Sequence, residues 1–227
     1  VSEGAEITVE ANPEDVTADI AARWRDAGVN RVSLGVQSFD ERVLAWMHRT
    51  HQRAQSERAA ALLRDAGIGN VSADLIFALP AALDRDWRAD VQRALHLDVD
   101  HVSLYGLTVE PHTPLGRWRE RGEVTEAPEE TYEADFLYAH DAFLAGGFEH
   151  YEVSNFSRNG RRSRHNSAYW SGAPYVGVGP SAHGFDGGRR RWNVAPYAEW
   201  AARLSRGEGV ESGGETLSPE NRRLERV

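Results

Sequence analysis

The chain has 227 residues, a formal net charge of −9 at pH 7 and no cysteine. The negative charge argues against a general nucleic-acid-binding protein, which needs a basic face to displace counterions from phosphates. The absence of cysteine excludes disulfides, zinc–thiolate sites and iron–sulfur ligation by this sequence. Because no apolar run approaches the length that crosses a bilayer and no signal-like segment is visible, we expect a cytoplasmic protein.

Strand-like and helix-like segments alternate in the first half of the chain. Runs rich in β-branched and apolar residues predict strands at 7–10, 31–37, 70–77 and 101–108. Helices are predicted between them from three sets of apolar residues at helical spacing: Ile20, Trp24 and Ala27; Ala59, Leu62, Leu63 and Ala66; Trp87, Val91, Ala94 and Leu95. Thr17 and Asp84 are the predicted N-caps. This alternation predicts an α/β fold with a parallel sheet, for which part of a (β/α) barrel and a doubly wound sheet fit equally well.

The pattern changes after residue 112. A charged stretch leads to a predicted long helix that ends at Gly146-Gly147, and residues 148–193 are rich in glycine, aromatic residues and turns. A short helix is predicted at 197–204, and Pro219 is expected to open another. We therefore expect a domain boundary at 112/113, with a smaller α+β region at 113–227.

Each predicted strand carries a polar residue near its C-terminal end. These residues are Glu10, Gln37, Asp74 and Thr108. In parallel α/β folds the side chains at this edge converge on a ligand, so four such residues in succession favour a binding site. The alternative is that the two acids cap helices or form internal ion pairs. Arg49 could clamp a carboxylate beside such a site, although a solvated surface arginine is the simpler interpretation of that residue alone.

Five segments together resemble the radical SAM core of the HemN/HemW family. They are Val-Glu-Ala-Asn-Pro at 9–13, Val-Ser-Leu-Gly-Val-Gln-Ser-Phe at 32–39, His-Arg at 48–49, Ala-Asp-Leu-Ile at 73–76 and Val-Ser-Leu-Tyr-Gly-Leu-Thr-Val-Glu-Pro at 102–111. The resemblance implies that residues 1–112 are the C-terminal part of a radical SAM (β/α) barrel and that 113–227 are an incomplete HemN-type C-terminal region. It also implies that the family's S-adenosylmethionine contacts fall on Glu10, Gln37, Arg49, Asp74 and Thr108. Carboxylate, amide and guanidinium groups suit the hydroxyl, amine and carboxylate groups of that cofactor.

The resemblance also implies a [4Fe–4S] cluster held by a CxxxCxxC loop that this sequence does not contain. Because the sequence begins with Val1 and its one methionine is Met47, we expect a fragment that lacks this N-terminal segment. Two positions depart from the family pattern. Ala78 begins a segment that is usually Gly-Leu-Pro-Gly-Gln-Thr, and Ser181 stands where relatives typically have glycine.

The second region resembles the HemW branch of the family. Its HNxxY signature falls on His165, Asn166 and Tyr169, which the resemblance assigns to heme, with His165 as the ligand of the heme iron. Nearby cationic side chains could pair with heme propionates; they are Arg161, Arg162 and Arg164. His183 is a secondary candidate ligand. From the residues alone, a structural histidine and a solvated arginine loop are the more ordinary interpretations.

Three functions follow from these observations. The HemW branch implies a heme chaperone that binds heme and S-adenosylmethionine and delivers heme to acceptor proteins. The alternative within the family is an oxygen-independent coproporphyrinogen III oxidase, which carries out a radical decarboxylation in porphyrin biosynthesis. The strand-end carboxylates alone also fit a (β/α) enzyme that uses ordinary acid–base chemistry.

Overall fold

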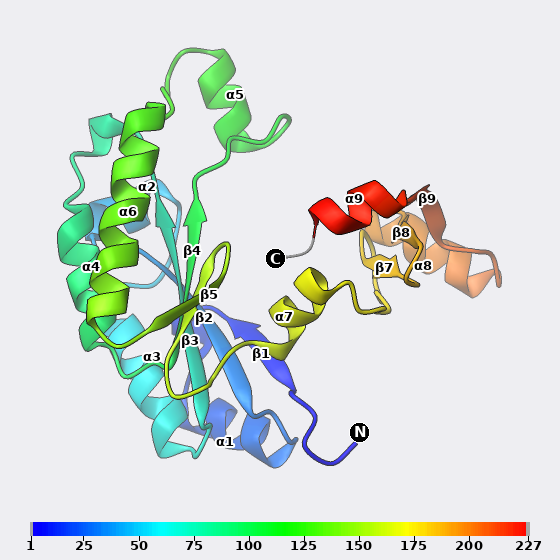
Figure 1. Cartoon of the computed structure of the whole chain (residues 1–227), viewed down its shortest axis with the longest axis horizontal. Coiled ribbons are helices and arrows are strands. Elements are labelled where there is room, and N and C mark those ends of the chain that lie inside the picture. Colours follow the sequence, from blue (N-terminus) through cyan, green and yellow to red (C-terminus); the bar gives the residue numbers. More distant parts are fainter. Residues whose placement is uncertain (1, 226–227) are drawn as a thin grey trace. The chain divides into compact units, whose positions relative to one another are not determined.

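The computed structural model describes residues 2–225 and divides the chain into two compact units, with the boundary between Arg162 and Ser163. The first unit begins with four parallel strands that are neighbours in chain order (Figure 1). They are β1 (Thr8–Ala11), β2 (Arg31–Gln37), β3 (Asn70–Phe77) and β4 (His101–Gly106). The helices between them are η1 (Pro13–Asp15), α1 (Ala18–Asp26), α2 (Glu41–Trp46), α3 (Arg53–Asp65), η2 (Ala81–Leu83) and α4 (Trp87–His96). The α/β prediction is confirmed; β2 and β3 have the predicted bounds, while β1 is displaced by one residue and β4 ends two residues earlier.

One of the two predicted N-caps is confirmed. The Thr17 side chain accepts a hydrogen bond from the Ile20 amide at 3.2 Å and opens α1. The prediction for Asp84 is wrong, because η2 ends there in a left-handed residue with φ 47°. Asp86 caps α4 instead, accepting from the Ala89 amide at 3.0 Å.

The two faces of the parallel sheet differ in chemistry. Val32, Leu34 and Leu75 belong to the set that points to one face and packs in a continuous apolar core with α1, α3, α4 and α6 (Glu129–Ala145). Figure 1 shows these helices on the same side of the sheet. The opposite face carries polar residues that are paired in register across the strands: Glu10 with Ser33, Ser33 with Ser72, Ser72 with His101, and Asp74 with Ser103. Helices on a single face and strands in chain order are the arrangement of a partial (β/α) barrel rather than of a doubly wound sheet.

The segment after β4 continues the first unit. α5 (Pro114–Glu120) precedes α6, and β5 (Glu149–Glu152) and β6 (Asn155–Ser157) extend the sheet in the order β1-β2-β3-β4-β6-β5, with β6 antiparallel to β4. Phe143 and Phe156 are fully buried in the core of this unit. The boundary between compact units therefore lies at 162/163 and not at the expected 112/113, since α6 and the β5–β6 hairpin pack on the barrel strands.

The second unit is an α+β structure built on a three-stranded antiparallel sheet, β7-β8-β9. Its elements are α7 (Arg164–Ser171), β7 (His183–Phe185), β8 (Arg189–Asn193), α8 (Tyr197–Ser205), β9 (Glu211–Thr216) and α9 (Pro219–Leu224). The helices predicted at 197–204 and from Pro219 correspond to α8 and α9. Over residues 2–225, no helix has both the length and the apolar character needed to cross a membrane.

Candidate functional site

A cavity of about 240 Å³ lies where β1, β2 and β3 carry their polar residues. It brings together four of the five side chains predicted to bind S-adenosylmethionine: Glu10, Gln37, Arg49 and Asp74. The remaining lining residues are Ala11, Asn12, Asp15, Ser33 and Gly35. The cavity walls are predominantly polar, which suits a ligand with hydroxyl, amine and carboxylate groups.

Asp74 forms the floor of this cavity from β3. Its Oδ1 accepts a hydrogen bond from the Ser33 hydroxyl at 3.0 Å. Burial raises the pKa of Asp74 above its usual value, although hydrogen bonds from Ser103 and Ser33 oppose this rise. Burial also raises the pKa of Tyr105, and the negative charge of Asp74 adds to the rise. Asp74 is therefore a partly buried carboxyl group that lines the cavity and is hydrogen-bonded by Ser33.

Gln37 ends β2 in a conformation that non-glycine residues rarely adopt. Its φ is 64°, in the left-handed region, and strain of this kind is commonly found at binding sites. The turn that follows is held by Asp90 of α4, which accepts hydrogen bonds from the Ser38 hydroxyl at 2.5 Å and from the Phe39 amide at 2.9 Å. Arg85 lies 3.5 Å from the same carboxylate. The turn at Gln37 is thus fixed by a buried ion pair behind the sheet.

Arg49 reaches the cavity from the loop between α2 and α3. Its Nη1 donates a hydrogen bond to Asn12 Oδ1 at 3.1 Å. A Cβ atom added to Gly35 would lie 2.9 Å from Gln37 Nε2 and 3.3 Å from Arg49 Nη2, so a larger residue here would displace the ends of both side chains. A guanidinium held in this way can donate two parallel hydrogen bonds to a ligand carboxylate.

Thr108 does not line the cavity. It is exposed, two residues beyond β4, and its hydroxyl contacts the Gly106 carbonyl oxygen at 3.4 Å. Its assignment to the cofactor remains a prediction. The residues that the sequence analysis missed are Asn12, Asp15, Ser33 and Gly35. The signal for two of them was present, since Ser33, Gly35 and Gln37 alternate along one strand and alternate residues share a face.

Both departures from the family pattern fall on left-handed backbone. Ala78 has φ 54° and Ser181 has φ 58°, which is the region that favours glycine. The Ala78 amide donates to Asp135 Oδ2 at 3.2 Å. Glycine at these two positions of the family pattern is therefore explained by the positive φ. This chain adopts the same left-handed conformation with alanine and serine.

The predicted heme residues lie on α7 in the second unit. The rings of His165 and Tyr169 are 4.8 Å apart between centroids and perpendicular, as i and i+4 neighbours on one helix face. The Ser163 side chain caps this helix by accepting from the Asn166 amide at 3.2 Å. Burial raises the pKa of Tyr169, and the neighbouring Tyr175 adds to the rise. His165 and Tyr169 are both exposed, and Asn166 is half-buried.

The basic residues just before α7 and at its start are not equivalent. Arg162 forms a bidentate ion pair with Glu149, with Nε–Oε1 and Nη2–Oε2 distances of 2.8 and 2.7 Å. Arg161 and Arg164 are exposed. His183 lies on β7, where its ring is 5.7 Å from that of Trp192, and it is not on the helix that carries His165. A propionate partner among these arginines remains a prediction.

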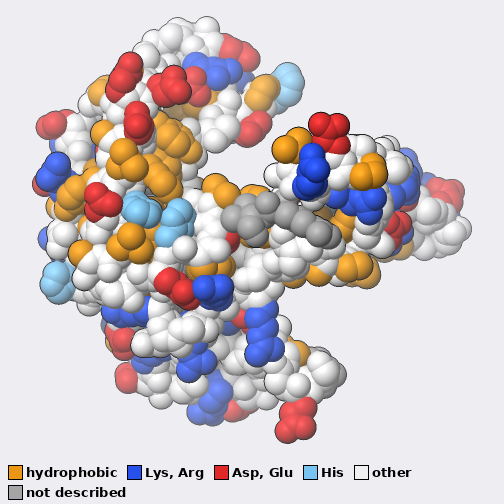
Figure 2. All heavy atoms as spheres, viewed as in Figure 1, with side chains coloured by type: hydrophobic (Ala, Val, Ile, Leu, Met, Phe, Trp, Pro, Cys, Tyr) orange, Lys and Arg blue, Asp and Glu red, His pale blue; other side chains and the backbone are white. Residues whose placement is uncertain are grey.

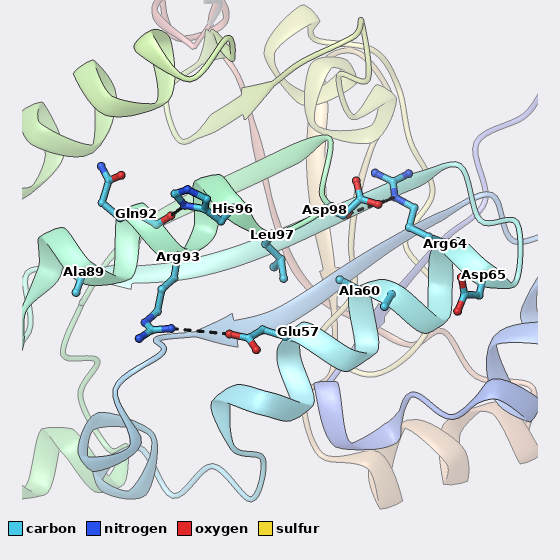
Figure 3. A pocket seen from close by; sticks show the side chains of 11 residues that line it. Glu57, Ala60, Arg64, Asp65, Ala89, Gln92, Arg93, His96, Leu97 and Asp98 are labelled. Carbon is cyan, nitrogen blue, oxygen red and sulfur yellow. Dashed lines mark hydrogen bonds and ion pairs between the residues drawn. The ribbon is translucent and has the colours of Figure 1, made fainter.

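A larger cavity of about 760 Å³ lies elsewhere on the first unit, as a groove between α3 and α4 on the outside of the sheet (Figure 3). Its charged side chains face one another: Glu57 Oε1 is 3.9 Å from Arg93 Nη1, and Arg64 Nε is 3.5 Å from Asp98 Oδ2. Figure 3 shows these pairs at the rim, with Ala60 and Leu97 between them. None of the predicted site residues lines this groove.

Comparison with known proteins connects these features to a family. The model of the radical SAM superfamily matches residues 1–94. A protein of Mycobacterium tuberculosis named heme chaperone HemW is 44% identical over 199 residues, which are 86% of this chain and 51% of that protein. A protein of the same name from Lactococcus lactis is 40% identical over 192 residues, or 84% of this chain and 50% of the relative.

The fold is also that of a solved structure, the coproporphyrinogen III oxidase HemN from Escherichia coli, described as a radical SAM enzyme. The TM-score is 0.76 at 20% identity, covering 96% of this chain and 52% of the other. The chain spans about half the length of the curated relatives that it matches. Alongside the parallel half-barrel and the cavity at its strand ends, the first 94 residues thus match the radical SAM superfamily, and 84–86% of the chain is similar to proteins named heme chaperone HemW.

Proposed function

We propose that this chain belongs to a heme chaperone of the HemW type, which binds S-adenosylmethionine in the half-barrel and heme through α7, and delivers heme to acceptor proteins. The observation that carries the proposal is the convergence of Glu10, Gln37, Arg49 and Asp74 on one cavity. The identity of 40–44% to relatives named heme chaperone HemW supports the chaperone over the oxidase. The likeness to HemN, at 20% identity, supports the fold alone.

The residues present fit S-adenosylmethionine. Gly35 leaves the space that a Cβ would take from Gln37 and Arg49, and the acidic and basic groups around it complement an amine and a carboxylate. We assign the carboxylate of the ligand to Arg49, and its hydroxyl and amine groups to Glu10, Gln37 and Asp74. In radical SAM proteins the cofactor is a source of a carbon-centred radical when it is bound to a reduced cluster.

The residues present do not fit a [4Fe–4S] cluster, because the sequence contains no cysteine. Family membership implies the cluster as well as S-adenosylmethionine. Its ligands are therefore proposed to lie outside this sequence, and no step of the proposed function is derived through the cluster.

For heme, His165 is the proposed axial ligand. A neutral imidazole binds heme iron well, and Tyr169 lies against the same ring. Asn166 occupies the adjacent helix position. The cytoplasmic location and the heme-acceptor proteins inferred from the sequence belong to this proposal as well.

Titration with hemin tests the heme site. We expect the chain to shift the Soret band of added hemin and the His165→Ala variant to lose that shift, because the axial ligand is removed. The His183→Ala variant is the matched control and should retain it. An unchanged spectrum for His165→Ala would exclude His165 as the ligand.

Isothermal titration calorimetry tests the cofactor site, with S-adenosylmethionine added to the wild-type chain and to Asp74→Asn. Weaker binding by the variant is the expected result. Conversion of coproporphyrinogen III under anaerobic conditions would instead favour the oxidase, and turnover without S-adenosylmethionine would favour acid–base chemistry.

A further inference from the structure

The carboxylate of Glu14, in η1, contacts the loop that carries Arg49 at two residues. Thr50 donates its hydroxyl to Oε1, and His51 Nδ1 lies 3.2 Å from Oε2 without the geometry of a hydrogen bond. Partial burial acts to raise the pKa of Glu14, but the hydrogen bond from Thr50 and the charges of His51 and Arg49 outweigh it and lower the pKa. Glu14 is thus held as an anion by the loop that follows Arg49.

His51 connects the same loop to β2. Its side chain is fully buried, and its Nε2 lies 3.2 Å from the carbonyl oxygen of Val36, the residue before Gln37. A carbonyl oxygen can only accept, so Nε2 donates this hydrogen bond. The imidazole therefore lies between the backbone that presents Gln37 and the carboxylate of η1.

Glu14 and His51 thus join the loop that carries Arg49 to η1 and to β2, two elements that line the cavity. Arg49 itself donates to Asn12, the residue just before η1, at 3.1 Å. His48, on the other side of Arg49, has φ 54°, so the loop enters Arg49 through a left-handed residue. The guanidinium donates directly to Asn12, whereas Glu14 and His51 act on the two residues that follow Arg49 in the loop.

We propose that Glu14 and His51 are positioning residues that set the guanidinium of Arg49 for the carboxylate of the ligand, and so give the cavity its preference for S-adenosylmethionine over adenosine thioethers that lack this carboxylate. The inference rests on the proposed function, since it takes S-adenosylmethionine as the ligand. Neither side chain lines the cavity, so both act through Arg49.

The test compares two ligands by calorimetry: S-adenosylmethionine and 5′-methylthioadenosine, which has the adenosine but no amino acid portion. Glu14→Gln is the principal variant because this side chain is partly exposed and its loss should leave the fold intact. We expect about a tenfold loss of affinity for S-adenosylmethionine and less than about a twofold change for 5′-methylthioadenosine. His51→Gln is the second variant and should show the same selectivity.

Two controls separate positioning from a general structural effect. Glu57→Gln removes the same charge from an ion pair on the outer face of α3 and should change neither affinity. In an Arg49→Ala background, Glu14→Gln should cause no further loss, because residues that act through one another are not additive. Thermal unfolding of each variant verifies the fold.

The outcomes are distinct. Equal losses for both ligands, or an additive loss in the Arg49→Ala background, would show that Glu14 maintains the fold and would overturn the inference. Wild-type binding of both ligands with no effect of Glu14→Gln would overturn the inference and leave the proposed function standing. A wild-type chain that binds neither ligand would overturn both.

Discussion

Gly35 lies in β2 between the side chains of Gln37 and Arg49, and its single missing carbon atom is what lets both enter the cavity. The two atoms that a Cβ would approach are the ends of flexible side chains. They can move aside at small cost to the fold, but they are the atoms that are proposed to hold the ligand. Binding and stability are therefore separable at this position.

We predict that Gly35→Ala weakens S-adenosylmethionine binding by about tenfold, or about 1.4 kcal/mol. The free energy of unfolding should change by less than about 1 kcal/mol, since no backbone atom is displaced. Calorimetry and urea unfolding measure the two effects. Gly209→Ala is the matched control, because no atom lies within 4 Å of its added Cβ; an equal loss of affinity in this control would contradict the explanation.

The predicted residues that the structure brings to one cavity are those whose polarity is unusual for their place in the strands. Glu10, Gln37 and Asp74 interrupt apolar strands, and a polar group in such a strand needs a reason. Asn12 and Glu14 lie at the start of η1 and within it, where polar residues are ordinary, so only the folded structure shows that they bond to Arg49 and Thr50, respectively. Thr108 follows a strand in sequence, yet β4 ends two residues before it and does not direct it to the cavity.

At the scale of elements, His101 joins three strands on the polar face of the sheet. Its Nδ1 lies 2.7 Å from Ser72 Oγ on β3, and its Nε2 lies 2.7 Å from the hydroxyl of Tyr151 on β5. Burial, with a contribution from the charge of Arg31, lowers the pKa of His101 to about 3. The neutral, buried imidazole of His101 thus links the β5–β6 hairpin to the parallel strands through its hydrogen bonds with Tyr151 and Ser72.

This pKa predicts how stability depends on pH. The unfolded chain binds a proton at His101 near pH 6.5 and the folded chain resists it, so His101 contributes stability above pH 6.5 that is lost as the pH falls toward 3. The slope for one such group is at most about 1.4 kcal/mol per pH unit. Urea unfolding between pH 7 and pH 5 should show a steeper loss for the wild type than for His101→Gln.

His183→Gln serves as the control for this measurement, since His183 is exposed and should keep the wild-type slope. A His101→Gln variant with the same slope as the wild type would show that other groups govern the acid sensitivity.

Element boundaries followed local signals closely where those signals were unambiguous. β2 and β3 alternate buried apolar residues with polar ones, and α1 has a threonine cap, so the local pattern predicts each of them well. Asp84 and Asp86 are both residues of the N-cap type, and sequence alone does not show that η2 ends at Asp84 and leaves Asp86 to cap α4. The short strands β5 and β6 have no periodic pattern of their own; β6 pairs with β4, and β5 pairs with β6.

At the scale of the whole chain, the domain boundary was the feature that sequence predicted least well. The change in composition after residue 112 is real, but α6 buries Ala139 and Phe143 against the barrel. Which element packs on which depends on contacts between residues far apart in sequence, and composition does not encode them. The fold class was predictable because it depends on alternation, which is local.

The first unit leaves apolar surface uncovered. On α6, Tyr132, Leu137 and Leu144 are between 42% and 50% exposed, and Figure 2 shows hydrophobic and histidine side chains gathered over this part of the molecule. β1 and β5 are the two edges of the open sheet. Exposed edges and apolar patches of this kind promote association between chains.

We therefore predict that the isolated chain self-associates with increasing concentration. Analytical ultracentrifugation should show a rising average mass, and Leu137→Glu should lower it by placing a charge in the patch. Asp141→Glu, at an exposed position on the same helix, should behave as the wild type. A wild-type mass that stays monomeric across the concentration range would contradict the prediction.

The separation of the sheet into a polar and an apolar face has a consequence for how the protein can change over evolution. Substitutions on the polar face can alter ligand chemistry without touching the residues that hold the helices, because alternate positions serve the two purposes. The deletion of a single residue within β3 is a different event. It would exchange the two sets, turning Asp74 toward the helices and Leu75 toward the cavity. The strands should therefore accept many exchanges of residue but almost no change of length, and variation in length should concentrate in the connections between them.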